Sequence, residues 1–595
     1  MDEHCDQGCQ NLRWALALLD GLVAGGMRHL VFSPGSRSTP LLLAAQRQTS
    51  LTLTPILDER SAAFFALGLA RAAGHPVGLL CTSGSALAHW FPAVIEAYES
   101  EIPLILLSAD RPPELRGWGA NQTIDQTRLF GGFVREFHDP GTAESGAAAL
   151  KMMRTLGARV AAVSLGNWPG PVHINLPFRE PLVPTAECSA ESNPPLSLNR
   201  NSGHKTTLAS SEQSWGEDID VWTRDLTAMM SGRGLICCGP GTFSPVGESL
   251  APLGFAEALW KCSEQLAVPV LCDPLSGLRF GADSTHRITR YDSFLRHPAT
   301  AAALKPDWVL RIGRAPVSKT LLNWLADIPT ILVDPGQGWS DPNKDVRVRV
   351  NADASSFCLW LATLAQDVMD KQTHADWSAQ WTAIEQQCAQ LTTNYLAQAP
   401  WCEAHLLTTL LAHLPADDGL FCANSMPIRQ LDTWSGGRSA PLGIFGNRGA
   451  SGIDGQTSTL AGLNASGIPI TGLLGDLSFF HDLSGLLLLR QLQRPCIVLN
   501  NGGGRIFDYL PQRGLPDFER LWRTPIDLDC GALLRPFSIA HCAVTNGDEF
   551  QAALRECVNP SEHQSSGVIE VRIDAELSRR VHYEFWQHIQ ASQSI

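Results

Sequence analysis

This sequence has few positively charged residues, no long apolar run and no features of a secretory signal in its first residues. The 595 residues include 45 Lys and Arg and 59 Asp and Glu. The formal net charge of −14 argues against a nucleic-acid partner, although it does not exclude local basic pockets. No apolar run approaches the ~18 residues that a membrane-spanning helix needs. Residues 1–5 lack the basic flank and apolar core of a secretory signal. We therefore expect a cytoplasmic protein without a membrane span.

Cysteine is present without an organised pattern. The 16 cysteines are scattered along the chain, and no His/Cys cluster completes a metal or redox site around Cys5 and Cys9 or around the adjacent Cys237 and Cys238. In a long chain without a secretion signal, such cysteines are expected to be reduced thiols.

Apolar strands alternate with helical segments in three successive regions. The first covers residues 1–185 and the second residues 218–370, while the third, residues 371–595, opens with a Gln- and Trp-containing helix. Residues 186–217 are rich in Ser, Asn, Pro and Thr and are typical of a linker. The alternation predicts an α/β protein with three tandem open parallel-sheet domains.

Two polar residues in the third region follow predicted strands. Asp476 comes after the apolar run 468–474, Asn501 follows the run 496–499, and the leucine-rich segment 483–492 between them has helical length. This pattern predicts strand–helix–strand, with both side chains at the carboxyl ends of parallel strands, where open sheets bind ligands. Carboxylate and amide oxygens suit Mg²⁺, with Mn²⁺ as an alternative, and glycines 502–504 allow close approach of backbone to a diphosphate.

Taken singly, Gly475-Asp476 and Asn500-Asn501 are ordinary turn dipeptides. The pair at one-crossover spacing resembles the Gly-Asp … Asn-Asn motif of thiamine diphosphate enzymes. That cofactor also needs a protein carboxyl beside its pyrimidine ring to exchange a proton with it. Glu59 is the candidate, because Glu59 to Ala63 (Glu-Arg-Ser-Ala-Ala) is similar to the glutamate motif of these enzymes. An isolated glutamate there would simply favour a helix N-terminus.

Over its whole length the chain resembles the thiamine diphosphate-dependent decarboxylase and synthase superfamily. The resemblance implies a pyrimidine-binding domain (1–185), a central domain and a diphosphate-binding domain, and a homodimer or dimer of dimers with active sites at subunit interfaces. It implies metal ligands Asp476, Asn501 and the Gly503 carbonyl, and an apolar wedge, Ile453, that bends the cofactor. The other cofactor contacts that it implies are Glu59, Gly84, Gly475, Leu477, Ser478, Ile506 and Phe507. Leu477 stands where many members have glycine, which removes no metal ligand.

Four arginines lie in predicted loops at strand ends, and an arginine fork suits a carboxylate. They are Arg37, Arg111, Arg429 and Arg448. Taken individually, each of them could equally be a surface or salt-bridge arginine. Four together indicate substrates with several carboxylates.

Residues 33–40 (Ser-Pro-Gly-Ser-Arg-Ser-Thr-Pro) and 447–455 (Asn-Arg-Gly-Ala-Ser-Gly-Ile-Asp-Gly) are similar to the menaquinone-pathway branch of the superfamily. The resemblance implies decarboxylation of 2-oxoglutarate and addition of its succinyl unit to isochorismate. It implies that Ser425 and Arg429 face 2-oxoglutarate, that Ser36, Arg37, Arg111 and Gln122 face isochorismate, and that Asn424 is a substrate contact. Two further substrate contacts are Arg448 and, on a short match, Lys319.

Two alternatives stay open at this point. One is another thiamine diphosphate enzyme, such as an acetolactate-type synthase or a simple 2-oxo acid decarboxylase, whose substrates need fewer cationic groups. The other is an inactive binding protein with the same fold. The presence of Glu59, Asp476 and Asn501 argues against the inactive protein.

Overall fold

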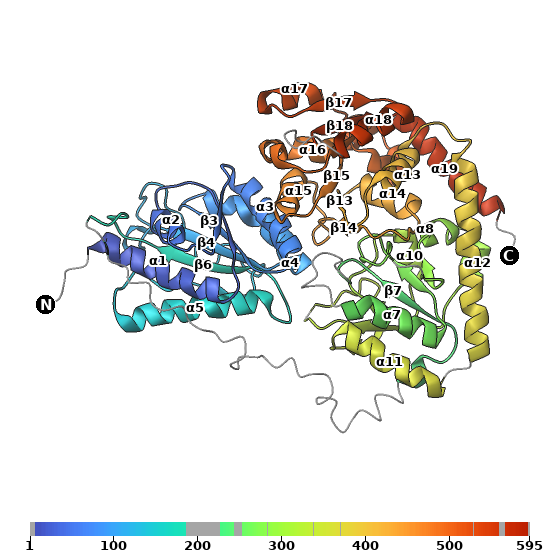
Figure 1. The fold of residues 1–595 in the computed structure, drawn as a ribbon, viewed down its shortest axis with the longest axis horizontal. Helices are drawn as coiled ribbons and strands as arrows, with labels where there is room; N and C mark the ends of the chain where they lie inside the picture. Colours follow the sequence, from blue (N-terminus) through green and yellow to red (C-terminus); the bar gives the residue numbers. More distant parts are fainter. Residues whose placement is uncertain are drawn as a thin grey trace. The chain divides into compact units, whose positions relative to one another are not determined.

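A computed structural model describes residues 6–185, 188, 226–242, 253–281, 284–336, 338–368, 371–527, 529–558 and 566–592. The chain forms two compact units. Unit 1 comprises residues 1–206, 447–468 and 481–488, and unit 2 comprises residues 207–446, 469–480 and 489–595. The described residues form three six-stranded sheets that follow one another along the chain. Figure 1 shows the strands and helices coloured in chain order. The predicted α/β class with three open parallel sheets is confirmed, whereas the predicted domain boundaries stay predictions.

The first sheet has the strand order β2-β1-β3-β4-β6-β5, and all its recorded pairs are parallel. Alternate residues of β4 face two separate cores, Ile105 and Leu107 on one side and Leu104 and Leu106 on the other, so both sheet faces are covered. Its strands are β1 (His29–Phe32), β2 (Thr52–Pro55), β3 (Val77–Cys81), β4 (Leu104–Asp110), β5 (Phe137–His138) and β6 (Val172–Pro177). Its helices are α1 (Gln7–Ala24), α2 (Thr39–Gln46), α3 (Glu59–Ala73), α4 (Phe91–Ser100) and α5 (Ala147–Leu165).

The second sheet has the order β12-β11-β10-β7-β8-β9 and is also parallel. Helices α7 and α11 pack against each other in this part of the chain, as Figure 1 shows. The strands are β7 (Gly234–Cys238), β8 (Val270–Cys272), β9 (Arg287–Ile288), β10 (Trp308–Ile312), β11 (Thr330–Val333) and β12 (Val346–Val350). The helices are α7 (Leu253–Leu266), α8 (Tyr291–Phe294), α9 (Pro298–Ala303), α10 (Lys319–Trp324) and α11 (Ala354–Val368).

The third sheet has the order β14-β13-β15-β16-β18-β17, again with parallel pairs. The strands are β13 (Gly419–Cys422), β14 (Gly443–Phe445), β15 (Ile470–Gly475), β16 (Cys496–Asn500), β17 (His541–Val544) and β18 (Val568–Arg572). The helices are α13 (Glu403–His413), α14 (Met426–Trp434), α15 (Gln456–Ala465), α16 (Asp476–His481), α17 (Cys530–Leu534), α18 (Gly547–Val558) and α19 (Ala575–Ser592). Because α15 belongs to unit 1, this stretch of the sequence contributes to both units.

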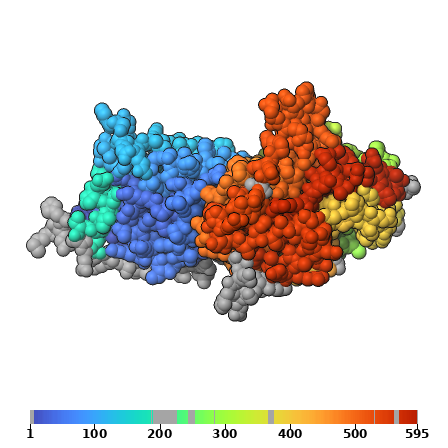
Figure 2. Space-filling model, turned by 90° about the horizontal axis from the view of Figure 1, so that it is seen from above, coloured from blue at the N-terminus to red at the C-terminus, as the bar shows by residue number. Residues whose placement is uncertain are grey.

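The long helix α12 (Lys371–Leu396) is the helical connection that the sequence predicted before the third sheet. It lies beside the C-terminal helix α19, and Figures 1 and 2 show the two in yellow and red. The Tyr395 hydroxyl donates to the Val581 carbonyl oxygen at 2.9 Å. This contact ties α12 to the last helix of unit 2.

Helices α3 and α15 cross at very close range within unit 1. A Cβ added to Gly68 would lie 2.1 Å from the Thr459 carbonyl oxygen, and one added to Gly462 would lie 2.0 Å from the Phe65 carbonyl oxygen. Only glycine allows two backbones to approach this closely. The first turns of both helices also contact the segment 482–484. Ser61 Oγ lies 2.9 Å from Ser484 Oγ, and the Ser458 N–H donates to Asp482 at 2.7 Å.

The leucine-rich segment between β15 and β16 differs from the single helix that its length suggests. Helix α16 ends at His481, and a 3₁₀-helix follows over Leu483–Gln491. The Gly485 N–H donates to the Asp482 carbonyl oxygen, a bond between residues three apart that starts the tighter helix. The carboxylate of Asp482 is meanwhile occupied by the Ser458 N–H.

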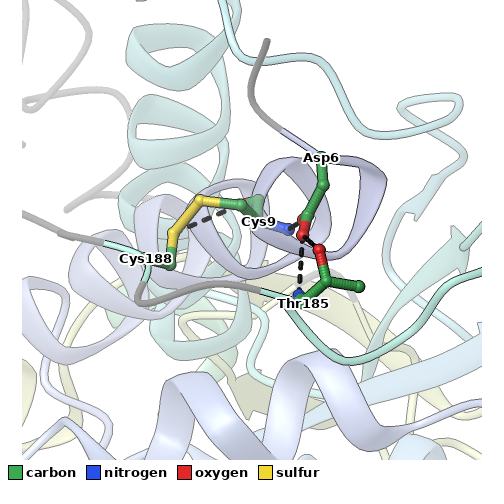
Figure 3. The surroundings of a disulfide bond; sticks show 4 residues. All are labelled: Asp6, Cys9, Thr185 and Cys188. Carbon is green, nitrogen blue, oxygen red and sulfur yellow. Dashed lines mark hydrogen bonds between the residues drawn. A yellow bond between two sulfur atoms is a disulfide. The ribbon is translucent and has the colours of Figure 1, made fainter. Parts of the chain in front are cut away.

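A disulfide joins Cys9 in α1 to Cys188, 179 residues later (Figure 3). The expectation that all cysteines are reduced is therefore wrong for this pair, while the other described cysteines are free. Asp6 holds the same two segments together, because its carboxylate accepts the backbone N–H groups of Cys9 and of Thr185, each at 2.6 Å. A pair this distant in the chain leaves no local spacing signal. Apart from Cys188, the predicted linker lies outside the described residues.

In the described part of the chain, no helix is long and apolar enough to span a membrane. The predicted absence of such a helix holds for these residues. The cytoplasmic location stays a prediction.

Candidate active site

Asp476 and Asn501 lie at the carboxyl ends of neighbouring parallel strands, as the sequence predicted. Strand β15 pairs with β16, and Gly475 is in register with Leu499. The buried Asp476 carboxylate accepts the backbone N–H groups of Gly503 at 2.8 Å and of Asn501 at 3.2 Å. The structure therefore brings together the three residues that the resemblance implies as metal ligands.

Burial raises the pKa of the Asp476 carboxyl, and the N–H groups of Gly503, Leu477, Gly502 and Asn501 oppose that rise. A cation beside Asp476 would favour the ionised form in the same way. Within the described residues no three His, Cys, Asp or Glu side chains gather as a metal-binding group. A carboxylate, an amide oxygen and a backbone carbonyl are instead the mixed oxygen set that Mg²⁺ takes when phosphate and water complete its shell.

The loop after Asn501 takes a backbone conformation that favours glycine. Gly502 has φ 78° and Gly503 φ 101°, and a Cβ at Gly503 would lie 3.0 Å from the carbonyl oxygens of Arg523 and Thr524. Ile506 and Phe507 follow in a short 3₁₀-helix (Arg505–Tyr509) and are half-buried. Directly after strand β15, Leu477 and Ser478 lie in the first turn of α16. These predicted cofactor contacts all flank Asp476 and Asn501 in the chain.

Glu403 is a functional candidate that the sequence did not indicate. It begins α13, is buried, and accepts a hydrogen bond from Asn501 Nδ2 at 2.9 Å. Burial raises the pKa of its carboxyl, opposed by the donors Asn501 and Gln430. Because Glu403 and Asn501 lie 98 residues apart, no motif connects them.

Ser425 and Arg429 meet at the turn between β13 and α14. Arg429 is exposed, and its Nη1 donates to the Ser425 carbonyl oxygen at 2.6 Å. Ser425 has φ 70° and ψ −124°, a conformation that non-glycine residues rarely adopt and that is concentrated at functional sites. Asn424, directly before it, is buried. The structure therefore brings these three predicted substrate contacts together on one turn.

Lys319 is the exposed first residue of α10, next to the helix cap Ser318. The Ser318 side chain accepts the Leu321 N–H at 3.0 Å. In the described residues, no hydrogen bond or ion pair joins Lys319 to another predicted site residue. Its substrate role stays a prediction.

In unit 1, Glu59 occupies the first turn of α3, as predicted. Asp58 caps this helix by accepting the Arg60 N–H at 2.8 Å, and Gly74 closes it with φ 62°. Burial, with the nearby Glu59 charge as a smaller cause, raises the pKa of the Cys81 thiol. Glu59 is half-buried, and because its charge acts on Cys81, it lies near the carboxyl end of β3, where the loop containing Gly84 begins.

The loop after β3 contacts the predicted substrate residue Gln122. Gly84 has φ 90°, and its N–H donates to Gln126 Oε1 at 2.9 Å. Gln122 Nε2 donates to the Ser83 carbonyl oxygen at 3.0 Å, and the Ser83 hydroxyl donates to the Gln122 carbonyl oxygen at 3.1 Å. The structure therefore brings Gly84 and Gln122 together.

Arg37 and Arg111 converge on one carboxylate, that of Glu180. Arg37 Nη2 lies 2.6 Å and Arg111 Nη1 lies 3.5 Å from Glu180 Oε1. Arg37 is buried and also donates from Nη1 to the Phe178 carbonyl oxygen at 2.8 Å, whereas Ser36 beside it is exposed. The Glu180 side chain is 70% exposed, so its carboxylate stays largely hydrated while it pairs with the two guanidinium groups.

The loop that carries Arg448 and Ile453 is held by a buried carboxylate from α4, Glu96. Glu96 accepts the N–H groups of Gly449 and Ala450, each at 2.8 Å, and of Ser451 at 3.3 Å. A cavity of about 180 Å³ lies beside this loop, lined partly by Glu96 and Ala450. Arg448 and Ile453 are both half-buried. Glu96 was not indicated by the sequence, because it lies 353 residues from Gly449.

Two known protein families match parts of this chain. Residues 13–129 match a family described as "Thiamine pyrophosphate enzyme, N-terminal TPP binding domain", and residues 215–422 match "Middle domain of thiamine pyrophosphate". The chain is therefore a member of the thiamine diphosphate (thiamine pyrophosphate) enzyme class.

Relatives that match nearly the whole chain share one more specific name. A protein of Geobacillus kaustophilus (strain HTA426) is 40% identical, covering 97% of each chain. A protein of Dechloromonas aromatica (strain RCB) is 41% identical over 92% of this chain and 97% of its own. Both are named 2-succinyl-5-enolpyruvyl-6-hydroxy-3-cyclohexene-1-carboxylate synthase, as is a relative from Haloarcula marismortui (strain ATCC 43049 / DSM 3752 / JCM 8966 / VKM B-1809), 39% identical over 97% of this chain and 98% of its own.

The chain belongs to the family of 2-succinyl-5-enolpyruvyl-6-hydroxy-3-cyclohexene-1-carboxylate synthases. The predicted superfamily and the predicted branch within it are both confirmed. The roles of the individual site residues stay predictions.

Proposed function

We propose that this protein decarboxylates 2-oxoglutarate with thiamine diphosphate and adds the succinyl unit to isochorismate. The product is 2-succinyl-5-enolpyruvyl-6-hydroxy-3-cyclohexene-1-carboxylate, an intermediate of menaquinone biosynthesis. The observation that carries the proposal is the convergence of Asp476, Asn501 and Gly503 at two neighbouring strand ends, in a chain of this family.

Asp476, Asn501 and the Gly503 carbonyl would hold Mg²⁺, or Mn²⁺ in its place, against the diphosphate of the cofactor. The glycine-rich loop and residues 475–478 would lie along that diphosphate, with Ile506 and Phe507 as apolar neighbours. Support comes from the oxygen donor set and from the positive φ of Gly502 and Gly503, which exposes backbone groups without a side chain in the way. When bound, the cofactor supplies the electron sink that decarboxylation requires.

Glu59 would exchange a proton with the cofactor's pyrimidine ring, and Gly84 would let the backbone approach that ring. Support comes from the place of Glu59 in the first turn of α3, near the carboxyl end of β3. A carboxyl positioned in this way contributes through proton transfer. Ile453 would press against the same cofactor and hold its two rings in a bent arrangement.

The substrates would be held by their carboxylates. Arg37 and Arg111 already share the Glu180 carboxylate, and isochorismate would replace Glu180 there, with Ser36 and Gln122 as neutral partners. Asn424, Ser425 and Arg429 would bind the 2-oxoglutarate end, and Arg448 and Lys319 would add positive charge. The guanidinium fork matches a carboxylate in two places at once, which fixes orientation as well as affinity.

The two halves of the site would come from different subunits of a homodimer, or of a dimer of dimers. Family membership supports this arrangement. Size-exclusion chromatography with light scattering, on the full chain with cofactor, would test it.

The decisive experiment incubates the purified chain with thiamine diphosphate, Mg²⁺, 2-oxoglutarate and isochorismate. We expect carbon dioxide and the coupled product in equal amounts, and neither without the cofactor. Replacing 2-oxoglutarate with pyruvate separates this function from that of an acetolactate-type enzyme. Turnover of pyruvate at a similar kcat/KM, or carbon dioxide without any coupled product, would contradict the proposal.

A further inference from the structure

A chain of buried side-chain hydrogen bonds leads from an indole to the predicted metal ligand Asn501. Trp434 Nε1 donates to Gln430 Oε1 at 2.7 Å, and Gln430 Nε2 donates to Glu403 Oε2. Asn501 Nδ2 donates to the other oxygen of Glu403, Oε1, at 2.9 Å. All four residues are buried. The chain connects α14, which follows the turn of Ser425, to the loop after β16.

The direction of every bond in this chain follows from Trp434, which can only donate, and from Glu403, which can only accept when it is ionised. An indole nitrogen can only donate, so Gln430 must turn its carbonyl oxygen toward Trp434 and its NH₂ group toward Glu403. An ionised carboxylate can only accept, so Glu403 takes one N–H from Gln430 on one oxygen and one from Asn501 on the other. Asn501 therefore has to point its NH₂ group at Glu403.

The backbone of Asn501 is held independently. Its N–H donates to Asp476 at 3.2 Å, and its carbonyl oxygen accepts from Arg505 Nε at 2.8 Å. With the backbone held, a half-turn of the amide plane about the Cβ–Cγ bond exchanges the side-chain oxygen and nitrogen. Only the oxygen can bind a metal cation. The Glu403 bond therefore decides whether Asn501 can act as a ligand.

We propose that Glu403 is a positioning residue that orients the Asn501 side-chain oxygen toward the metal, with Trp434 and Gln430 fixing the sense of the hydrogen-bond chain. This inference rests on the proposed function, because it takes Asn501 as a metal ligand. Partners of this kind behind a metal ligand typically change metal affinity by about 10–100-fold when they are replaced.

Glu403→Gln tests the direction of the chain without changing its shape. Gln430 still presents NH₂ to residue 403, because Trp434 holds its oxygen, so the new glutamine must turn its own oxygen to Gln430 and its NH₂ group to Asn501. Asn501 must then rotate its oxygen toward residue 403 and its nitrogen toward the metal. We expect the apparent affinity for Mg²⁺ at a fixed thiamine diphosphate concentration, measured by calorimetry, to fall by about 10–100-fold.

A second substitution should restore the affinity. In Glu403→Gln with Asn501→Asp, one aspartate oxygen accepts from the glutamine NH₂ group and the other still faces the metal. We expect the double variant to bind Mg²⁺ at least ~10-fold more tightly than Glu403→Gln alone. Asn501→Asp alone places two buried carboxylates against each other and should bind more weakly than the double variant.

The matched control is Glu385→Gln. Glu385 accepts hydrogen bonds from the Thr289 hydroxyl at 2.6 Å and the Arg290 N–H at 3.0 Å, and it shares no partner with Asn501. Thermal unfolding of each variant without cofactor reports general damage to the fold. A merely structural role for Glu403 would lower this unfolding temperature and would not be rescued by Asn501→Asp.

The outcomes separate this inference from the proposed function. Glu403→Gln with Mg²⁺ affinity within about threefold of the unmodified protein would overturn the inference, as would a double variant no better than the single one. An unmodified protein that binds no thiamine diphosphate in the presence of Mg²⁺ would contradict the proposed function itself.

Discussion

Asp476 accepts backbone hydrogen bonds and is a predicted metal ligand, and its substitution should test both roles. Its carboxylate would bind the metal, and it also accepts the N–H groups of Asn501 at 3.2 Å and Gly503 at 2.8 Å. Asp476→Ala removes the acceptor from both buried donors. Asp476→Asn keeps one side-chain oxygen of nearly the same position but loses the negative charge.

The two variants should therefore differ in stability without cofactor. Each buried donor that loses its acceptor costs about 1–3 kcal/mol, so Asp476→Ala should lower the free energy of unfolding by roughly 2–6 kcal/mol. The lower part of this range applies, because removing Asp476 also removes the desolvation cost that raises its pKa. Asp476→Asn should lose much less, because both N–H groups donate to Oδ2 and the amide oxygen can take the place of that atom.

Cofactor binding should instead be lost in both variants to a similar degree, because neither supplies an anionic metal ligand. Calorimetry with thiamine diphosphate, repeated at increasing Mg²⁺ concentration, measures this loss, and extra Mg²⁺ should restore binding only in part. Chemical denaturation without cofactor measures the stability difference. Tight cofactor binding by Asp476→Ala would show that the metal lies elsewhere, and equal stability of both variants would refute the role assigned to the two N–H groups.

Further predictions concern three other residues. Glu59→Gln should keep cofactor binding but reduce turnover by on the order of 10²–10⁴-fold, because the amide cannot exchange the proton; rates within a few-fold of the unmodified protein would remove Glu59 from the mechanism. Arg429→Ala should raise KM for 2-oxoglutarate and matter less for pyruvate, with partial rescue by lysine; an equal loss for both oxo acids in steady-state kinetics would reopen the substrate assignment. Burial lowers the pKa of His173 to about 3, below its ordinary value of 6.5, so its contribution to stability is complete above pH ~6.5 and is lost as the pH falls toward 3. This loss amounts to about 3 kcal/mol at pH 4, and His173→Gln should flatten the fall in unfolding temperature between pH 6.5 and 4; an unchanged slope would contradict this.

The sequence by itself determined the features that depend on near neighbours. Asp476 and Asn501 were placed at the ends of adjacent parallel strands, because apolar runs and one crossover length are local patterns. The helix that begins at Glu59 and is closed by Gly74 was predicted for the same reason, since helix-favouring residues and a left-handed glycine act within a few residues. The resemblance to the family was likewise recognised from short sequence motifs, residues 33–40 and 447–455.

Only the tertiary structure decided which distant polar groups meet. Glu403 reaches Asn501 across 98 residues, Glu96 reaches Gly449 across 353, and Glu180 lies between Arg37 and Arg111. Cys9 and Cys188 pair in the same way, contrary to the expectation of free thiols. A hydrogen bond or disulfide between separate elements imposes no periodicity on the sequence, because each partner needs only the right residue type at one point in space. The site residues at the strand ends could therefore be predicted from the sequence. Their distant hydrogen-bond and ion-pair partners could not.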